Sequence, residues 1–422
     1  MNSRERVIKS INHLVPDRVP IDFGGTLVTG ISAGIVSKLR EFYKLENSTP
    51  VKIIEPYQIL GEIADDLKES LGVDVIGLSG KNNMFGFENS GWKKWELFDG
   101  TAVLVPQKFN TIPREDGSLV QYPQGDNSVP PSARLPRGGF YFDSIIRQQI
   151  TDYNNLNVND NLEEFSIIDE EELRFIECES EHFYKNTNFA IAGNFGGMSF
   201  GDIALVPAPS LKNPKGIRDI EEWYISLMKR KEFVKEIFAN QCEISLKNIE
   251  LIYQAVANRI QVIIISATDF GTQNAPFIPV TLYNEIFKPF HLRLNSWVHK
   301  NTSWKTFMHS CGSIENLIPE FIDAGFDILN PVQLSAQNMD AVALKEKYGD
   351  KIVFWGGGVD TQKTLPFGSK EEVEVEVKSR LEVFSKGGGF VFSSIHNIQP
   401  KTPVENIATM IEIVKNFRIY DS

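Results

Sequence analysis

The sequence predicts an α/β protein in which eight strand–helix units close into a (β/α)8 barrel. Short apolar runs alternate with segments that carry apolar residues at helical spacing, such as 314–324 and 371–384. The run from Val262 to Ile265 is apolar throughout, which is typical of a parallel strand buried on both faces. Repeated units of this kind indicate a parallel sheet, and eight of them fit a closed barrel. The predicted strands are 19–23, 74–78, 190–195, 262–268, 306–310, 327–330, 352–355 and 390–393.

Local signals at helix ends agree with this order of elements. The polar N-terminus leads into an amphipathic helix, and Gly325 follows the helical segment 314–324 as a stop glycine. The stretch 402–405 reads Thr-Pro-Val-Glu, a capping-box pattern with proline at the first helical position. It predicts that the last helix begins there.

Residues 81–188 interrupt the alternation of strands and helices. Segments 92–97, 102–106 and 118–122 predict β-strands joined by Asp-Gly turns, and the acidic stretch 155–181 is expected at the surface. We interpret 81–188 as a partly β insertion after the second strand that covers the barrel mouth, within a single domain spanning residues 1–422. A partner-docking surface is the alternative role for this insertion.

Composition excludes several classes of function. With 42% hydrophobic and 23% charged residues, the 422-residue chain has the composition of an ordinary globular protein. Its net charge of −12 disfavours nucleic acid, which is bound by clustered Lys and Arg. Three dispersed cysteines predict reduced thiols, and we expect a cytoplasmic protein without a signal peptide or a membrane span. A homodimer is compatible with the sequence.

His309 and Cys311 are the strongest candidates for chemistry. Residues two apart on an extended strand point to the same side, so an imidazole and a thiol project together where the fifth strand ends. They offer half of a zinc site, whereas the alternative is a core thiol beside a hydrogen-bonded histidine. His396 follows the last strand, and barrel closure could bring it over the same mouth as a third ligand. It could instead bond a loop carbonyl or act as a general acid or base.

Further polar residues stand at other predicted strand ends. Asp269 ends the fourth strand and could be a fourth ligand, a partner of a metal-bound histidine, a proton donor or a loop cap. Because barrel enzymes keep their chemistry at the C-terminal strand ends, the other polar residues there are expected to bind substrate. They are Asn194, Gln273, Asn330, Gln333 and Asp360.

Several motifs carry a family resemblance that spans nearly the whole chain. They lie in 4–20, in His309-Ser-Cys-Gly, in Asn330-Pro-Val-Gln, in Trp355-Gly-Gly-Gly-Val-Asp and in 396–406. In these motifs the chain resembles the uroporphyrinogen decarboxylase superfamily, and within it the branch of cobamide-dependent methyltransferases. That branch implies a barrel with zinc held by a His-x-Cys pair and by a cysteine after the last strand. His309 and Cys311 match the pair, while His396 falls at or next to the third position and departs from the pattern.

The decarboxylases of the superfamily fit less well. They have a histidine at the equivalent of His396, but their arginine-bearing loop after the first strand is missing. Here that loop, 24–32, carries no positive charge. A porphyrinogen with many carboxylates needs cationic partners, so uroporphyrinogen is not the expected substrate.

The resemblance therefore implies a zinc-dependent methyltransferase. It would move a methyl group between a small methylated substrate or a thiol and a corrinoid, as in O-demethylation. His309, Cys311 and His396 would hold the metal, and Asp269 would orient a ligand or supply a proton. The corrinoid is expected on a partner protein, because the Asp-x-His-x-x-Gly pattern of corrinoid carriers is absent. The alternatives are a metal-free decarboxylase or lyase that uses His396 and Asp269 on a small carboxylated substrate, and a non-enzymatic corrinoid-binding or scaffolding subunit.

Overall fold

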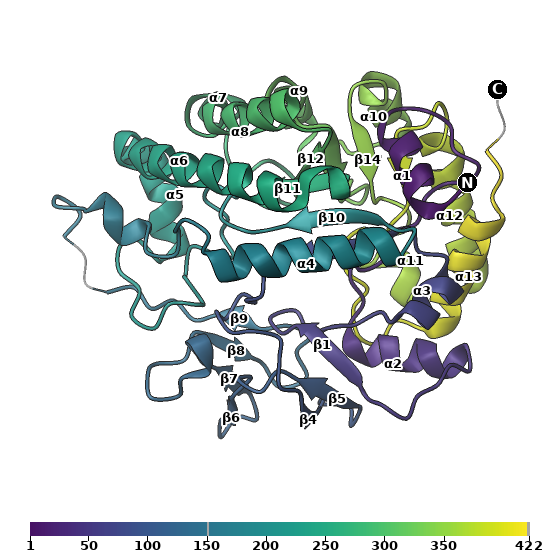
Figure 1. Ribbon diagram of the computed structural model, residues 1–422, viewed down its shortest axis with the longest axis horizontal. Helices are drawn as coiled ribbons and strands as arrows, with labels where there is room; N and C mark the ends of the chain where they lie inside the picture. Colours follow the sequence, from purple (N-terminus) through teal and green to yellow (C-terminus); the bar gives the residue numbers. More distant parts are fainter. Residues whose placement is uncertain (150–151, 420–422) are drawn as a thin grey trace.

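A curled parallel sheet forms the centre of the protein, whose computed structural model describes residues 1–149 and 152–419. Its seven strands lie in the order β15-β14-β13-β12-β11-β10-β3, so neighbours in the chain are also neighbours in space (Figure 1). Every pairing between them is parallel, as the alternation of apolar runs predicts. The strands are β3 (Val75–Ser79), β10 (Ala190–Asn194), β11 (Val262–Ser266), β12 (Lys305–His309), β13 (Ile328–Asn330), β14 (Val353–Trp355) and β15 (Phe390–Val391).

The predicted first strand closes the ring, although it forms only a single bridge. Ile21 pairs in parallel with Phe392, just beyond β15. The backbone N–H of Asp22 donates to the Phe392 carbonyl at 2.8 Å, and that of Asp74, just before β3, donates to the Ile21 carbonyl at 2.8 Å. All eight predicted strand positions and the barrel are thereby confirmed.

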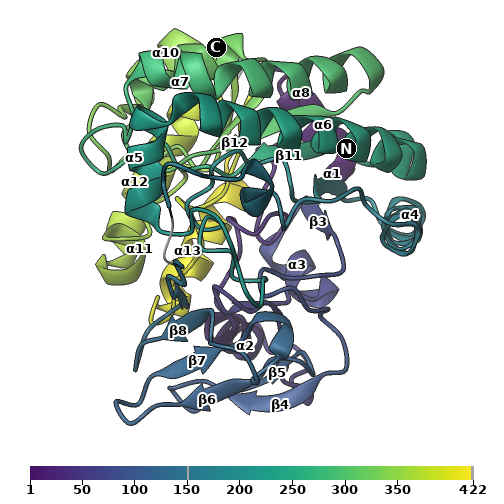
Figure 2. The same ribbon diagram turned by 90° about the vertical axis from the view of Figure 1, so that its left-hand side faces the viewer.

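Helices surround this barrel (Figures 1 and 2). None of the helices in the described ranges is long and apolar enough to cross a membrane. They are α1 (Ser3–Ile11), α2 (Ala33–Phe42), α3 (Asp65–Leu71), α4 (Glu170–Asn186), α5 (Ile220–Lys229), α6 (Lys231–Val256), α7 (Val280–Ile286), α8 (Lys288–Asn301), α9 (Ile318–Asp323), α10 (Ala341–Tyr348), α11 (Thr364–Phe367), α12 (Lys370–Phe384) and α13 (Val404–Asn416).

Two predictions about helix ends have different outcomes. Gly325 follows α9 with a φ of +86°, a backbone conformation that glycine adopts without strain, so the stop signal is confirmed. The capping box before α13 is wrong, because Pro403 occupies the N-cap and no side chain caps the helix. The Thr402 hydroxyl instead donates to the Gln399 carbonyl at 2.9 Å.

Two small sheets lie beside the barrel, at the bottom of both ribbon views (Figures 1 and 2). One has the order β2-β1-β5-β4 and the other the order β6-β7-β8-β9. The three strands predicted in the insertion are present as β4, β5 and β7. The strands are β1 (Val51–Glu55), β2 (Leu60–Gly61), β4 (Lys93–Glu96), β5 (Ala102–Val105), β6 (Thr111–Pro113), β7 (Leu119–Gln121), β8 (Ala133–Leu135) and β9 (Asp143–Ser144).

The inserted part of the protein is not one uninterrupted segment that leaves the barrel after the second strand and returns. Strand β1 precedes the second barrel strand, yet it pairs in parallel with β5, so two regions of the chain build this sheet. The stretch 155–181 is not exposed throughout, because α4 buries Ile176 and Ser180 and the Arg259 guanidinium donates to the Ser180 hydroxyl. Residues 81–188 therefore contain a barrel helix as well as inserted strands. Lys401, after β15, lies over the Phe140 ring at 5.4 Å. That residues 81–188 cover the barrel mouth stays a prediction.

A buried carboxyl group in the small sheet makes stability depend on pH. Burial raises the pKa of Glu55 to about 7, although the backbone N–H groups of Tyr57 and Gln58 donate to its carboxylate. The folded state then keeps this proton to a higher pH than the unfolded chain. The protonated Glu55 carboxyl therefore stabilises the fold fully below the ordinary glutamate pKa, and this stabilisation is lost as the pH rises through about 7. Across this pH range the free energy of unfolding falls by about 3 kcal/mol.

We therefore expect Glu55→Gln to flatten the fall in the free energy of unfolding between about pH 5 and pH 8. Urea denaturation across this pH range measures it. The matched control is Glu62→Gln in the same region, whose side chain is 44% exposed and should leave the pH dependence unchanged. A Glu55→Gln profile parallel to that of the unsubstituted protein would contradict the expectation.

Candidate metal centre

His309 and Cys311 point to the same place at the C-terminal end of β12. The Cys311 Sγ lies 3.5 Å from the His309 Nε2. Between them, the backbone N–H of Ser310 donates to the Asn330 carbonyl at 2.8 Å, which prolongs the sheet pairing beyond the strand. The chain thus stays extended across the motif, and alternate side chains share a side.

His396 reaches the same pair from the loop after β15. Its ring centroid lies 5.6 Å from that of His309, and the potential ligand atoms of the three residues all lie within 4.8 Å of one another. Asn397 holds this loop, because its Oδ1 accepts the Gly30 N–H at 2.6 Å and its Nδ2 donates to the Gln58 Oε1 at 2.7 Å. The structure therefore brings the three predicted ligands together.

A chain of hydrogen bonds favours one tautomer of the His309 ring and fixes its direction. The Asn330 Nδ2 donates to the Trp355 carbonyl at 2.8 Å, so its Oδ1 faces the His309 Nδ1 at 2.6 Å and accepts its proton. The Nε2 lone pair is then directed at Cys311, as a metal ligand requires. The chain continues where the Trp355 indole donates to the buried Asp22 carboxylate at 2.8 Å.

We expect Asn330→Ala to weaken zinc binding by about 10- to 100-fold, because His309 would lose the acceptor that sets its tautomer. Competition with a chromophoric chelator measures this affinity. Asn330→Asp keeps the acceptor for His309 but loses the donor to the Trp355 carbonyl, so it should recover only part of the affinity. Asn295→Ala is the matched control, a buried amide that donates to the Ala324 carbonyl away from the site. Unchanged affinity in Asn330→Ala would show that the tautomer is set elsewhere.

Asp269 positions the cysteine. Its Oδ1 accepts the backbone N–H of Cys311 at 2.7 Å and lies 3.7 Å from the His309 Nε2. Its side chain is 34% exposed, so it borders both the ligand set and the open mouth. Of the roles predicted for Asp269, these contacts favour that of a partner that positions the candidate ligands.

The Cys311 thiol and the His396 imidazole are both held in their uncharged forms, so a metal ion would have to displace the thiol proton. Burial and the nearby Asp269 raise the pKa of the Cys311 thiol well above its usual value. Burial, with the neighbouring His309, lowers the pKa of His396 to about 4 and keeps this imidazole neutral. One sulfur and two imidazole nitrogens are a donor set that fits Zn²⁺ with one position left open.

The structure gives protein partners to most of the residues expected to touch substrate. The amide of Asn330 is used by His309 and Trp355. Gln333 accepts the Gly312 N–H at 2.8 Å and donates to the Gln273 Oε1 at 3.0 Å. It thereby links the loops that follow β11, β12 and β13. Asp360 accepts the N–H groups of residues 362 and 363 and so caps its own loop. Asn194 ends β10 opposite Ser79, and no described residue forms a hydrogen bond with its side chain.

Sequence reasoning missed two groups near Asp269, namely Asp202 and Tyr224, and Tyr224 borders a small cavity together with Asp269. Tyr224 comes from α5 and stacks on Phe277, with ring centroids 5.5 Å apart. Burial, with Asp269 nearby, raises the pKa of Asp202 to about 7 and that of Tyr224 to about 12. The only signal in the sequence was the position of Asp202 after the third strand. The cavity is lined by Gly201, Tyr224, Leu227, Thr268, Asp269, Phe270, Phe277, Ile278 and Phe287.

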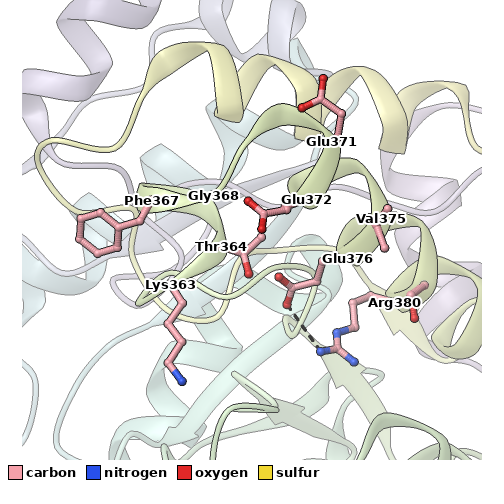
Figure 3. A pocket seen from close by; sticks show the side chains of 10 residues that line it. Lys363, Thr364, Phe367, Gly368, Glu371, Glu372, Val375, Glu376 and Arg380 are labelled. Carbon is pink, nitrogen blue, oxygen red and sulfur yellow. Dashed lines mark ion pairs between the residues drawn. The ribbon is translucent and has the colours of Figure 1, made fainter.

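A larger hollow lies elsewhere, on the surface of α11 and α12 (Figure 3). Phe367 stands at its edge and is 83% exposed, while Glu376 and Arg380 form an ion pair at 3.5 Å within it. None of the three ligand candidates lines this hollow. It is therefore separate from the candidate metal centre.

Comparisons with known proteins agree with the fold and the motifs. The family described as uroporphyrinogen decarboxylase (URO-D) matches residues 210–417, which include all three ligand candidates. Uroporphyrinogen decarboxylases from three strains of Coxiella burnetii are 29% identical over 75 residues, only 18% of this chain and 20% of each relative. A methyltransferase from Methanosarcina mazei shares the fold, with a TM-score of 0.55, 14% identity and 99% of both chains covered.

Proposed function

We propose that this chain, which belongs to the uroporphyrinogen decarboxylase superfamily, is a zinc-dependent methyltransferase that works with a corrinoid carried by a partner protein. The observation that carries the proposal is the convergence of His309, Cys311 and His396, whose ligand atoms lie within 4.8 Å of one another at the C-terminal mouth of the barrel. The fold shared with the Methanosarcina mazei methyltransferase supports it.

The residues of the mouth have distinct tasks in this proposal. Zinc, when bound, would act as a Lewis acid on a methylated donor or lower the pKa of a thiol acceptor. Asn330 orients the His309 ring, Asp269 holds the backbone of Cys311, and Asn397 holds the loop of His396. These contacts hold the three ligands in place before any metal or substrate arrives, which lowers the cost of ordering them.

The second candidate is a decarboxylase or lyase, which the Coxiella burnetii relatives favour. Two observations weigh against it. The loop 24–32 has no Lys or Arg to bind a carboxylated substrate. A pKa of about 4 also keeps His396 neutral at neutral pH, so it lacks the more acidic imidazolium proton that a general acid would supply.

The test compares zinc-loaded and zinc-stripped protein. Each is mixed with free reduced corrinoid and with methylated amines, ethers or thiols, and methyl–cobalt formation is followed by absorbance. We expect transfer that disappears on chelation and returns with zinc. Release of carbon dioxide from a small carboxylic acid that survives chelation would overturn the proposal in favour of the lyase.

A further inference from the structure

The loop that carries His396 is attached to a small sheet as well as to the barrel. The segment after the closing strand lies between this loop and β2, because Ile31 pairs in parallel with Ile398 and Ser32 pairs antiparallel with Leu60. The Ser32 N–H donates to the Ile398 carbonyl at 2.9 Å. Backbone pairing therefore extends the sheet β2-β1-β5-β4 as far as the loop that follows β15.

The turn between β1 and β2 adds side-chain contacts to this attachment. The Gln58 Oε1 accepts from the Asn397 Nδ2 at 2.7 Å, and the Gln58 Nε2 donates to the Leu27 carbonyl at 3.0 Å. Glu55 fixes the turn, because its carboxylate accepts the Gln58 N–H at 2.6 Å. Asn397 is buried, so water does not compete for its amide. Both ends of the Gln58 amide are thus used, one of them on the residue next to His396.

His396 depends on this support because its own ring has none. In the described part of the chain no hydrogen bond reaches the His396 ring, whereas Asn330 holds the ring of His309. The backbone of His396 has a φ of +69°, a conformation that a residue other than glycine keeps only when its surroundings impose it. The Ser394 hydroxyl donates to the His396 carbonyl at 2.7 Å. The direction of the ring therefore follows from how its backbone is held.

We propose that Gln58 is a positioning residue for the metal ligand His396 and acts through Asn397, a contact that we call the brace. The ligand set is then assembled on two supports. The barrel strand β12 carries His309 and Cys311, and the small sheet holds the third ligand against them. This inference rests on the proposed function and adds to it a task for the sheet beside the barrel.

The first experiment is a double-mutant cycle on zinc affinity, measured by competition with a chelator. Gln58→Ala should weaken zinc binding by about tenfold, as the loss of a ligand's support does. In a His396→Ala background the same substitution should have no further effect, because its path to the metal is gone. Gln58→Glu keeps the acceptor for Asn397 and should recover part of the affinity. Equal weakening in both backgrounds would overturn the proposal.

Asn110→Ala is the matched control for Gln58→Ala. Asn110 is a half-buried amide just before β6, and it donates to the Gly125 carbonyl at 2.7 Å. Its loss removes a side-chain contact of the same chemistry from the other small sheet. We expect unchanged zinc affinity in this variant. Weakening as large as that in Gln58→Ala would mean that zinc affinity only follows the stability of the small sheets, which would contradict a specific brace.

The second experiment uses the absorption spectrum of the Co²⁺-loaded protein. A thiolate ligand gives a charge-transfer band, and a four-coordinate cobalt site gives intense d–d bands. Gln58→Ala should keep the charge-transfer band, because Asp269 still holds Cys311, and should lose d–d intensity as water replaces His396. A substitution that only unfolds part of the protein lowers both kinds of band together. Such a parallel loss, or an unchanged spectrum, would count against the brace.

The ring signals of the six histidines in the metal-free protein separate this proposal from the proposed function. In nuclear magnetic resonance spectra, Gln58→Ala should shift or broaden the His396 signal, which His396→Ala identifies, and Asn110→Ala should leave it in place. Zinc uptake with an unmoved His396 signal would overturn the brace and leave the metal site standing. A shifted signal in a protein that takes up no zinc would support the brace and overturn the zinc-dependent function.

Discussion

Cys311→Ser is expected to weaken zinc binding by roughly 100-fold. A serine hydroxyl stays protonated at neutral pH and is a poor ligand for zinc, whereas the thiolate is one of its best. Structural zinc sites bind with about 10–16 kcal/mol in total, so the loss of one of three protein ligands costs at least about 3 kcal/mol, roughly 100-fold in affinity. Metal analysis after dialysis, followed by competition with a chelator, measures both occupancy and affinity.

The chain supplies controls for this experiment. Cys178→Ser removes an exposed thiol on α4, far along the chain from the ligand set, and should leave zinc binding unchanged. His396→Cys restores the cysteine that the methyltransferase branch has at or next to this position, and should bind zinc at least as tightly as the unsubstituted protein. Full zinc occupancy in Cys311→Ser at unchanged affinity would contradict the proposal that Cys311 is a zinc ligand.

Asp74→Ala is expected to destabilise the fold by about 3–5 kcal/mol. Asp74 is fully buried and accepts from the Arg6 guanidinium at 2.6 Å and from that of Arg18 at 2.7 Å. Its Oδ2 also accepts the backbone N–H of Ile21 at 2.9 Å, which ties the closing strand of the barrel to β3. Removing the carboxylate leaves two guanidinium groups short of a counter-charge and loosens the ring closure. Urea denaturation at neutral pH measures the change.

An exposed ion pair serves as the comparison for Asp74. Lys38 and Asp99 lie 3.7 Å apart, and both side chains are about half exposed. Because water screens such a pair, Asp99→Ala should cost no more than about 0.5–1 kcal/mol. A similar cost for Asp74→Ala would mean that the buried cluster contributes little to barrel closure.

The barrel and the three candidate metal ligands could be read from the chain because their signals are local. A buried parallel strand has to be apolar at every position, as in β11, so its pattern is visible without knowledge of its neighbours. The spacing of His309 and Cys311 fixes their common direction, because an extended backbone alternates its side chains. His396 could be added because each barrel strand delivers its C-terminal end to one mouth.

The partners of the polar side chains could not be predicted in this way. Asn330 and Gln333 carry the same amide chemistry as residues that bind substrate, yet here they hold His309 and Gly312. Only the closed ring places β13 beside β12 and so gives each amide a protein partner. The pairing of β1 with β5 escaped prediction for the same reason, since the two strands lie far apart in the sequence.

The sequence by itself determined the barrel, the order of its strands and the three residue types at its mouth, because periodicity and strand-end position are properties of short segments. The tertiary structure alone decided that Tyr224 borders a cavity together with Asp269. Helix α5 is packed against the mouth by contacts between distant segments, and such packing depends on how complementary surfaces fit in space.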